Sequence, residues 1–141
     1  MAAAAPQRER AHGALRPYAN DRLEIRHDPL KGRGVFARAA IGAGVLIEAA
    51  PVLLVPAHQR RLLDNTILHD YYFVWDGEDG DSSAAIALGL VSLCNHSRRP
   101  SARVRPNRAR ETLDLLTLTS IAAGGEITID YNCPLWFAVH D

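Results

Sequence analysis

Short stretches in which apolar and polar residues alternate recur along the chain, and clusters of turn residues separate them. They occupy residues 23–26, 35–37, 102–105, 113–118 and 127–131. Alternation with a period of two is typical of strands that bury one face. Turn signals that return about every 8 to 12 residues are typical of domains built from short strands. The pattern therefore predicts a mostly β fold of several small sheets.

Further apolar segments extend this prediction. Residues 45–50 and 52–55 are apolar enough to form strands, and Pro51 between them predicts an edge position or a bulge. Residues 71–75 form the most aromatic segment and predict another strand. The run 84–91 is almost wholly apolar, which predicts a buried approach to the polar residues that follow it.

One segment has the spacing of an amphipathic helix, which Pro56 opens and which extends from residue 57 to about residue 68. Its apolar residues recur at helical intervals and predict the face that packs on a sheet: Leu62, Leu63, Ile67 and Leu68. Its charged residues predict the face in water: Arg60, Arg61 and Asp64.

The length of 141 residues fits one domain. Hydrophobic residues make up 48% and charged residues 23%, which is the balance of a folded globular chain. Residues 1–20 lack periodicity and predict a flexible N-terminal arm. The folded domain is therefore assigned to residues 21–141.

Lysine and arginine together number 16, as do aspartate and glutamate, so the formal net charge is zero. A neutral chain has no overall attraction to nucleic acid or to an anionic membrane, and we expect it to bind neither directly. Cys94 and Cys133 are too few to complete a structural zinc site, which indicates a reduced protein without a metal. No apolar run is long enough for a secretion signal or a membrane span, which predicts a cytoplasmic location.

Asn95 and His96 stand at the end of the apolar run, just before a turn at Pro100. Polar side chains buried there need partners, because a buried unpaired group costs about 1–3 kcal/mol. A bound ligand could supply these partners, and so could a hydrogen-bond network within the protein. Cys94 beside His96 resembles a metal site only superficially, since Cys133 is distant in sequence. Asn95 also begins a glycosylation sequon, which functions only in a secreted chain.

Two more short motifs are each weak alone. Gly32-Arg33-Gly34 places glycines on both sides of a long side chain and leaves the backbone open to a ligand, although the same pattern is common in hairpin turns. Residues 125–132 end a strand at Tyr131, which by itself predicts no more than a packed aromatic ring.

Taken in order, the motifs resemble the SET domain of protein-lysine methyltransferases. The order is Gly-x-Gly at 32–34, the aromatic segment at 71–75, Asn-His-Ser-x-x-Pro at 95–100 and Gly-Glu-x-x-x-Asp-Tyr at 125–131. The resemblance runs from residue 23 to residue 136, and the chain is most similar to the minimal single-domain members of bacteria and large viruses. It implies a β-clip-like fold of small sheets with one short helix and a C-terminal pseudoknot.

The resemblance implies S-adenosylmethionine as the methyl donor. The residues that it implies for binding the donor are, in chain order, Gly32, Arg33, Gly34, Asn95, His96 and Trp136. The glycine loop would receive the methionine end, the Asn-His pair would hold the amino group and the adenine, and the tryptophan would lie in a closing C-terminal tail.

The resemblance also implies the residues on the substrate side. Tyr131 corresponds to the catalytic tyrosine, and Tyr71 and Tyr72 correspond to aromatic residues of the lysine channel. We expect Tyr131 to position the lysine amine and to stabilise the nearby sulfonium, because a phenol with an ordinary pKa of about 10 need not serve as a strong base. The chain is thus expected to be a protein-lysine N-methyltransferase.

The expected partner is a protein with an accessible lysine, such as a basic or histone-like tail. The acidic turn at residues 76–81 could attract such a segment, although acidic turns are more often only solvated. A homodimer is an expectation at the level of the family.

The chain departs from the family at three points. Ser101 stands where the family usually has asparagine, Arg98 where it frequently has cysteine, and Gly125-Glu126 where it has paired glutamates. These departures leave two other functions open. One is a SET-like module that binds the cofactor or a lysine peptide with little or no catalysis, and the other is a structural β-rich interaction domain.

Overall fold

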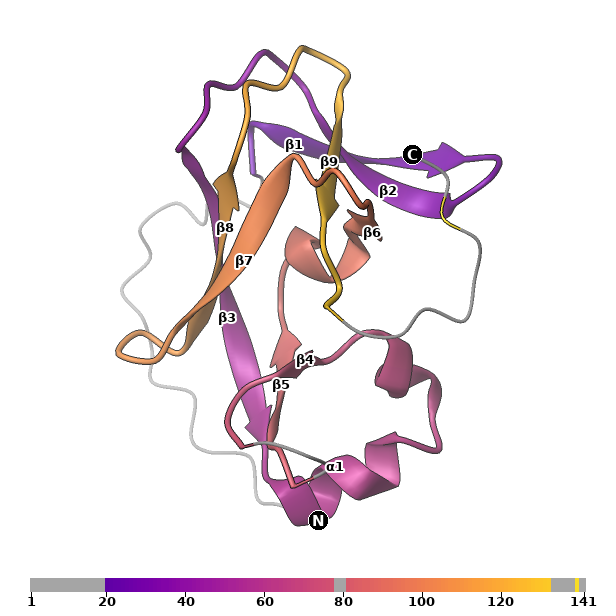
Figure 1. Cartoon of the computed structure of the whole chain (residues 1–141), viewed down its shortest axis with the longest axis vertical. Helices are drawn as coiled ribbons and strands as arrows, with labels where there is room; N and C mark the ends of the chain where they lie inside the picture. Colours follow the sequence, from indigo (N-terminus) through magenta and orange to yellow (C-terminus); the bar gives the residue numbers. More distant parts are fainter. Residues whose placement is uncertain (1–19, 78–80, 133–138, 140–141) are drawn as a thin grey trace, which may run out of the picture.

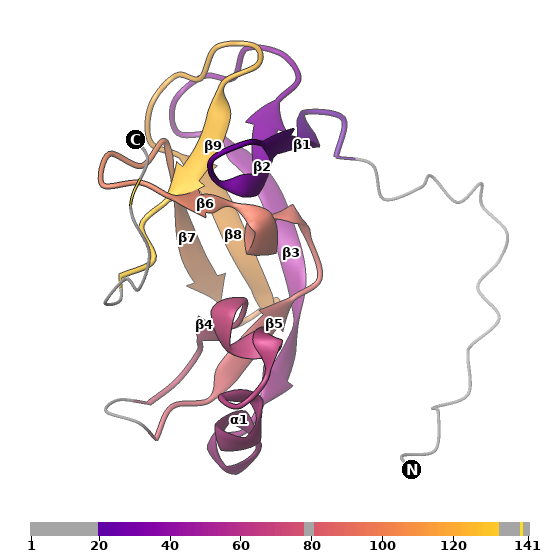
Figure 2. The same cartoon turned by 90° about the vertical axis from the view of Figure 1, so that its right-hand side faces the viewer.

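Two β-sheets form the framework of residues 20–77, 81–132 and 139, which are the residues that the computed structural model describes (Figures 1 and 2). The first sheet has the order β1 (Leu23–Asp28), β2 (Gly32–Ala37), β9 (Glu126–Ile129) and β6 (Asn95–His96). The second has the order β4 (Phe73–Val74), β5 (Ala84–Ala87), β3 (Leu46–Val55), β8 (Thr112–Thr117) and β7 (Ala102–Asn107). The prediction of a mostly β fold is confirmed. The predicted arm at 1–20 lies, apart from its last residue, outside the described residues.

Apolar side chains of both sheets meet in one core. The largest side chains that are fully buried come from β2, β8, β9 and the turn before β6: Val35, Leu113, Leu115, Ile127 and Val91. β7 alternates between buried and exposed residues over 102–105, as its period of two predicted, whereas β8 is buried on both faces, Asp114 and Thr117 included. The two sheets are therefore held together by the one hydrophobic core to which both contribute side chains.

β3 is longer than predicted, because it continues through Pro51. Leu46 to Pro51 pair with β8, and Val52 to Val55 pair with β5, so the proline stands where the pairing changes sides. The carbonyl of Pro51 accepts from the amide of Leu88, just beyond the end of β5. In a strand, the N–H and C=O of one residue point to the same side. The N–H that Pro51 lacks would therefore point toward β5, and its absence costs no hydrogen bond to β8. The bulge in β3 lies between Leu46 and Glu48 instead.

The helix prediction was wrong in its length and in its buried face. α1 spans Ala57–Leu63, and a separate 3₁₀ helix, η1, spans Ile67–Asp70. Thr66 separates them, since its hydroxyl donates to the Leu63 carbonyl and accepts from the Leu68 amide. The two helices lie at the end of the second sheet (Figure 2).

Polar contacts decide which face of α1 is buried. Arg60 is 8% exposed, whereas Leu62 and Ile67 are 70% and 73% exposed. The Arg60 guanidinium lies 2.9 Å from the Asp64 carboxylate, which in turn accepts from the Tyr72 hydroxyl at 2.8 Å. This network buries Arg60 and exposes Leu62 and Ile67, against the prediction, while Arg61 faces water as predicted.

Two other boundaries differ from the pattern. The strand predicted over residues 71–75 is reduced to β4, Phe73–Val74. β7 includes Pro106 and Asn107, which were predicted as a turn, and the turn follows at residues 108–111. Pro106 is tolerated because β7 is an edge strand of its sheet.

A parallel pair of strands brings the middle of the chain to its C-terminal part. In β6 and β9, Asn95 pairs with Thr128 and His96 pairs with Ile129. The Ser97 amide extends the ladder by donating to the Ile129 carbonyl at 3.0 Å. β9 is thereby held between β2 and β6 (Figure 1). Residues 133–138, into which the predicted pseudoknot continues, lie outside the described residues.

A buried carboxylate holds the turn that leads to β6. Glu48, only 4% exposed, accepts from the amides of Leu90 and Val91 at 3.0 and 2.8 Å. These are the first residues of a second 3₁₀ helix, η2, Leu90–Leu93. Carboxylates satisfy the unpaired amides at the start of a helical turn. Glu48 of β3 thus fixes the backbone just before Cys94 and Asn95.

Replacing Glu48 by alanine leaves these two amides without an acceptor. We expect Glu48→Ala to lower the free energy of unfolding by about 2–3 kcal/mol, measured by urea denaturation. Glu24→Ala, on the exposed side of β1, is the matched control and should change it by less than about 0.5 kcal/mol. Equal stabilities of the two variants would contradict the role of Glu48.

Candidate active site

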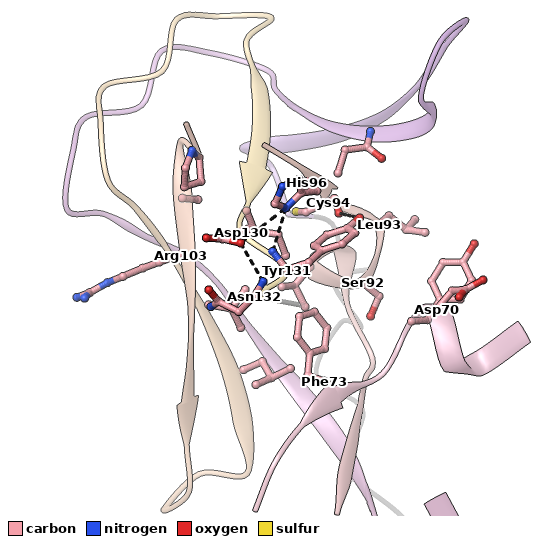
Figure 3. Close-up of a pocket in the computed structure, with 18 of the residues that line it drawn as sticks. Asp70, Phe73, Ser92, Leu93, Cys94, His96, Arg103, Asp130, Tyr131 and Asn132 are labelled. Atoms are coloured by element: carbon pink, nitrogen blue, oxygen red, sulfur yellow. Dashed lines mark hydrogen bonds and ion pairs between the residues drawn. The ribbon is translucent and has the colours of Figure 1, made fainter. Parts of the chain in front are cut away.

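A cavity of about 1340 Å³ lies where the two sheets, η1 and η2 meet. Its wall includes the β1–β2 turn, the end of η1 with β4, η2 with β6, the strand β7, and the end of β9 with the residues after it. Figure 3 shows Tyr131 near its centre, with Phe73 below it and Cys94 and His96 above. Segments distant in sequence therefore share one site.

Tyr131 is held at both its backbone and its ring. Its hydroxyl donates to the Cys94 carbonyl at 2.8 Å, and its amide donates to His96 Nδ1 at 3.1 Å. The rings of His96 and Tyr131 lie 5.2 Å apart at an angle of 57°. The tyrosine ring therefore has a defined direction, and two oxygens, the hydroxyl and the carbonyl, stand together in the cavity wall.

The hydrogen bond to its Nδ1 determines the state of His96. This buried nitrogen accepts from the Tyr131 amide, which leaves Nε2 as the ring nitrogen that can donate. Asp130 Oδ1 is 3.8 Å from the same nitrogen, too far for a hydrogen bond. Asp130 instead accepts from the Asn132 amide at 2.9 Å (Figure 3). His96 thus acts on the backbone of Tyr131.

Asn95 links the glycine loop to β9. Its side-chain amide donates to the Arg33 carbonyl at 3.1 Å and to Glu126 Oε1 at 2.8 Å. The other oxygen of Glu126 lies 3.1 Å from Lys31 Nζ. Both hydrogens of the Asn95 amide are therefore used within the protein, which is the internal network that the sequence left as an alternative.

Glycine is required at the two positions of the loop for different physical reasons. A Cβ on Gly34 would lie 2.9 Å from both Asn95 Nδ2 and Glu126 Oε1, so only glycine fits beside this network. Gly32 has a φ of +79°, in the left-handed region that favours glycine, and no atom lies within 4 Å of a Cβ built on it. The first glycine keeps the cavity open, and the second allows close packing behind it.

Ser101, which stands where the family usually has asparagine, forms hydrogen bonds through both its hydroxyl and its backbone amide. Its hydroxyl accepts from the Thr128 amide at 3.0 Å and donates to the Glu126 carbonyl at 3.1 Å. The Ser101 amide donates to Thr128 Oγ1 at 3.1 Å. These bonds attach the segment after β6 to β9, so the shorter side chain still connects the two segments.

The tyrosines predicted for the channel differ in their contacts. Tyr71 and Tyr72 both line the cavity and are half-buried. The Tyr72 hydroxyl donates to Asp64, and its ring meets His69 edge to face at 5.7 Å. Burial raises the pKa of Tyr72 above its ordinary value of 10.0, which keeps the hydroxyl protonated as a donor. Phe73 joins them in the wall.

Most of the predicted site residues come together. Those that line the cavity are Gly32, Arg33, Tyr71, Tyr72, Asn95, His96 and Tyr131. Gly34 lies directly behind the wall, against Asn95. The predicted Trp136 lies outside the described residues.

The sequence reasoning missed three contributors. Lys31 and Glu126 form an ion pair beside the loop; the sequence marked Glu126 as part of the Gly-Glu motif and Lys31 as the single lysine, but it did not pair them. The Cys94 carbonyl meets the Tyr131 hydroxyl, and a backbone oxygen leaves no signal in the sequence. Burial raises the pKa of the Cys94 thiol far above its usual range, so this cysteine is inert at neutral pH.

The described residues contain neither a cluster of metal ligands nor a helix that could span a membrane. Within them, no group of three or more His, Cys, Asp and Glu side chains is arranged to hold a metal ion. No helix in the same part of the chain has the length and apolar character needed to cross a membrane.

Comparisons with known proteins identify the class. The family model of the SET domain matches residues 32–132, and the chain belongs to this family. A Schizosaccharomyces pombe protein named "Histone-lysine N-methyltransferase, H3 lysine-37 specific" is 36% identical over 123 residues, 86% of this chain and 80% of that protein.

A solved structure supports the same fold. The crystal structure of a candidate histone methyltransferase from Plasmodium falciparum superposes with a TM-score of 0.62 at 24% identity, covering 82% of this chain and 97% of that one. The chain is a protein-lysine methyltransferase, as the order of its motifs predicted, and the alternative of an inactive module is not favoured. Enzymes of this family take their methyl group from S-adenosylmethionine.

The hydroxyl of Ser101 is expected to stabilise the junction of β6 and β9. Ser101→Ala removes the acceptor of the Thr128 amide, and we expect the free energy of unfolding to fall by about 1–2 kcal/mol. Chemical denaturation measures the change, with the exposed Ser120→Ala as the matched control. No difference between these variants would show that the bonds around Ser101 contribute nothing to stability.

Asp64 makes part of the stability depend on pH. The hydrogen bond from Tyr72, aided by His69 and Arg60, lowers the pKa of Asp64 below 3.8. A lowered folded-state pKa gives stability that is present above the unfolded value and is lost as the pH falls through the folded one. Tyr72→Phe should therefore cost about 1 kcal/mol at pH 6 and progressively less in acid, measured by urea denaturation at both pH values.

A second variant tests the assignment to this carboxylate. In the background Asp64→Asn, the cost of Tyr72→Phe should no longer change between neutral and acidic pH, because the charged acceptor is gone. A pH dependence that persists without Asp64 would assign the effect to another group.

Proposed function

We propose that the cavity is the catalytic centre for methyl transfer to a lysine of a basic, histone-type tail, with Tyr131 as the catalytic residue. The observation that carries this proposal is the pair of oxygens formed by the Tyr131 hydroxyl and the Cys94 carbonyl, 2.8 Å apart in the cavity wall. The glycine loop and the Asn95–His96 strand lie in the same wall.

The residues present fit S-adenosylmethionine. When bound, this donor supplies an activated methyl group on a positively charged sulfur. The open space at Gly32, which a Cβ would occupy, gives room for its methionine end beside the backbone of Arg33. Asn95 would contribute its side-chain oxygen and its backbone, since its amide hydrogens are already bonded. His96 would contribute its backbone and the ring edge at Nε2.

The aromatic wall addresses the charge of the substrate lysine. A free lysine has a pKa of about 10.4, so presenting its neutral amine at pH 7 costs about 4–5 kcal/mol. Burial between apolar rings lowers a lysine pKa because it removes water from the ammonium form. Tyr71, Phe73 and the Tyr131 ring line the cavity and provide these surfaces. The channel would thus favour the nucleophilic form of the amine.

Tyr131 would orient that amine and stabilise positive charge. Its hydroxyl donates its proton to the Cys94 carbonyl, so the lone pairs of the hydroxyl oxygen would face the substrate amine. Two partly negative oxygens fixed before the reaction stabilise a cationic transition state without reorganisation. The His96 bond to the Tyr131 amide keeps this oxygen in place. Positioning, and not proton abstraction, is the proposed role.

A basic tail suits the acidic groups at the rim of the cavity. Asp70 and Asp130 both line it and are exposed to solvent, so they can attract a lysine-rich segment. The Schizosaccharomyces pombe relative is named for its action on histone H3. We therefore take the histone H3 tail as the first substrate to test.

Removing the Tyr131 hydroxyl tests the catalytic assignment. We expect Tyr131→Phe to transfer methyl groups from labelled S-adenosylmethionine to histone H3 at least about 100-fold more slowly than the parent chain. Binding of the donor, measured by isothermal titration, should change by no more than a few-fold. Tyr72→Phe removes a phenol bonded to Asp64 and should slow transfer far less.

Two results would contradict the proposal in different ways. Unchanged turnover in Tyr131→Phe would show that another group is catalytic. Labelling of lysate proteins without labelling of histone H3 would leave Tyr131 in place and exclude the H3 tail as the substrate.

A further inference from the structure

The zero net charge of the chain hides an uneven distribution. Residues 98–110 contain six arginines and no acidic residue, whereas the rest of the chain has 10 basic and 16 acidic residues. The six are Arg98, Arg99, Arg103, Arg105, Arg108 and Arg110, and we call them the arginine strip. The expectation that nucleic acid is not bound rested on the net charge, which averages over this contrast.

The fold displays the arginine strip along one edge of the molecule. It follows β7 and its two flanking turns, and β7 is the last strand of the second sheet. All six side chains are exposed, while Ala102 between them points into the core. Figure 1 shows β7 at the open side of the sheet, running down to the β7–β8 turn. The positive charge is therefore concentrated along one line of the surface.

Acidic side chains neutralise only part of the strip. Arg105 lies 3.7 Å from Asp114, and Arg108 lies 2.8 Å from Asp76. Arg99, Arg103 and Arg110 have no ion pair within the described part of the chain. At least three guanidinium groups are thus available to an anionic partner.

We propose that the arginine strip binds the phosphate backbone of double-stranded DNA without regard to sequence. At about 3.3 Å per residue, β7 spans about 17 Å, and its flanking turns bring the strip toward the length of one DNA turn, about 34 Å. Arginine forms paired hydrogen bonds with phosphate oxygens. Residues 98–110 contain no aromatic residue on which unpaired bases could stack, which favours a duplex over a single strand.

The strip lies next to the candidate active site without obstructing it. Arg103 borders the cavity, yet its side chain extends away from Tyr131 in Figure 3. DNA on this edge would leave the Tyr131 side open to a protein tail. The inference does not depend on the proposed function, because binding can be measured without any methyl transfer.

The test is fluorescence anisotropy with a labelled 30-base-pair DNA duplex of arbitrary sequence at several KCl concentrations. The parent chain should bind with a micromolar Kd at low salt. Arg99→Gln, Arg103→Gln and Arg110→Gln combined should weaken binding at least tenfold. They should also make the slope of log K against log [KCl] shallower by about 2.7, or about 0.9 for each phosphate that the variant no longer neutralises.

The matched control carries the same change of charge elsewhere. Arg22, Arg38 and Arg61 are exposed and lie outside the strip, and their combined change to glutamine should alter binding by less than about twofold. Thermal melts would establish that both triple variants are folded. Equal losses in the two variants, no binding by the parent chain, or stronger binding of single-stranded RNA than of the duplex would each overturn the proposal.

Discussion

The parallel pairing of Asn95–His96 with Thr128–Ile129 is the constraint on which the site depends. Two-residue strands have little stability of their own, so side chains secure the junction. Asn95 bonds to Glu126, and Ser101 exchanges bonds with Thr128 across the same boundary. Tyr131 lies two residues after the end of β9, and this pairing sets its position relative to the cavity.

Buried polar side chains fix how the segments around the site are placed, because each side chain finds its hydrogen-bond partners in only one arrangement of the backbone. Glu48 reaches from β3 to the amides before β6, and His96 reaches from β6 to the amide of Tyr131. An unpaired buried group costs about 1–3 kcal/mol, so shifting either segment would leave several such groups unmet. The same bonds bring the Cys94 carbonyl and the Tyr131 hydroxyl together in the wall of the site.

The spacing of apolar residues and the net charge of the chain were the least reliable guides to the structure where charged side chains are involved. The apolar spacing of residues 57–68 predicted Leu62 and Ile67 as buried, but the Arg60–Asp64–Tyr72 network turned that face outward. In the same way, a net charge of zero concealed the arginine strip. Ion pairs and exposed charge depend on which segments become neighbours, and a window of sequence does not contain that information.

The sequence by itself determined the strand content, because period-two alternation is a local property. The order of its motifs determined the family, and that resemblance singled out Gly32, Gly34, Asn95, His96 and Tyr131. Only the tertiary structure decided how these residues act. It bonded the Asn95 amide within the protein, made His96 a support for the Tyr131 backbone, and gave Ser101 a full set of partners. Each of these contacts joins residues at least 25 positions apart, and the packing of the two sheets, not the local pattern, brings them within bonding distance.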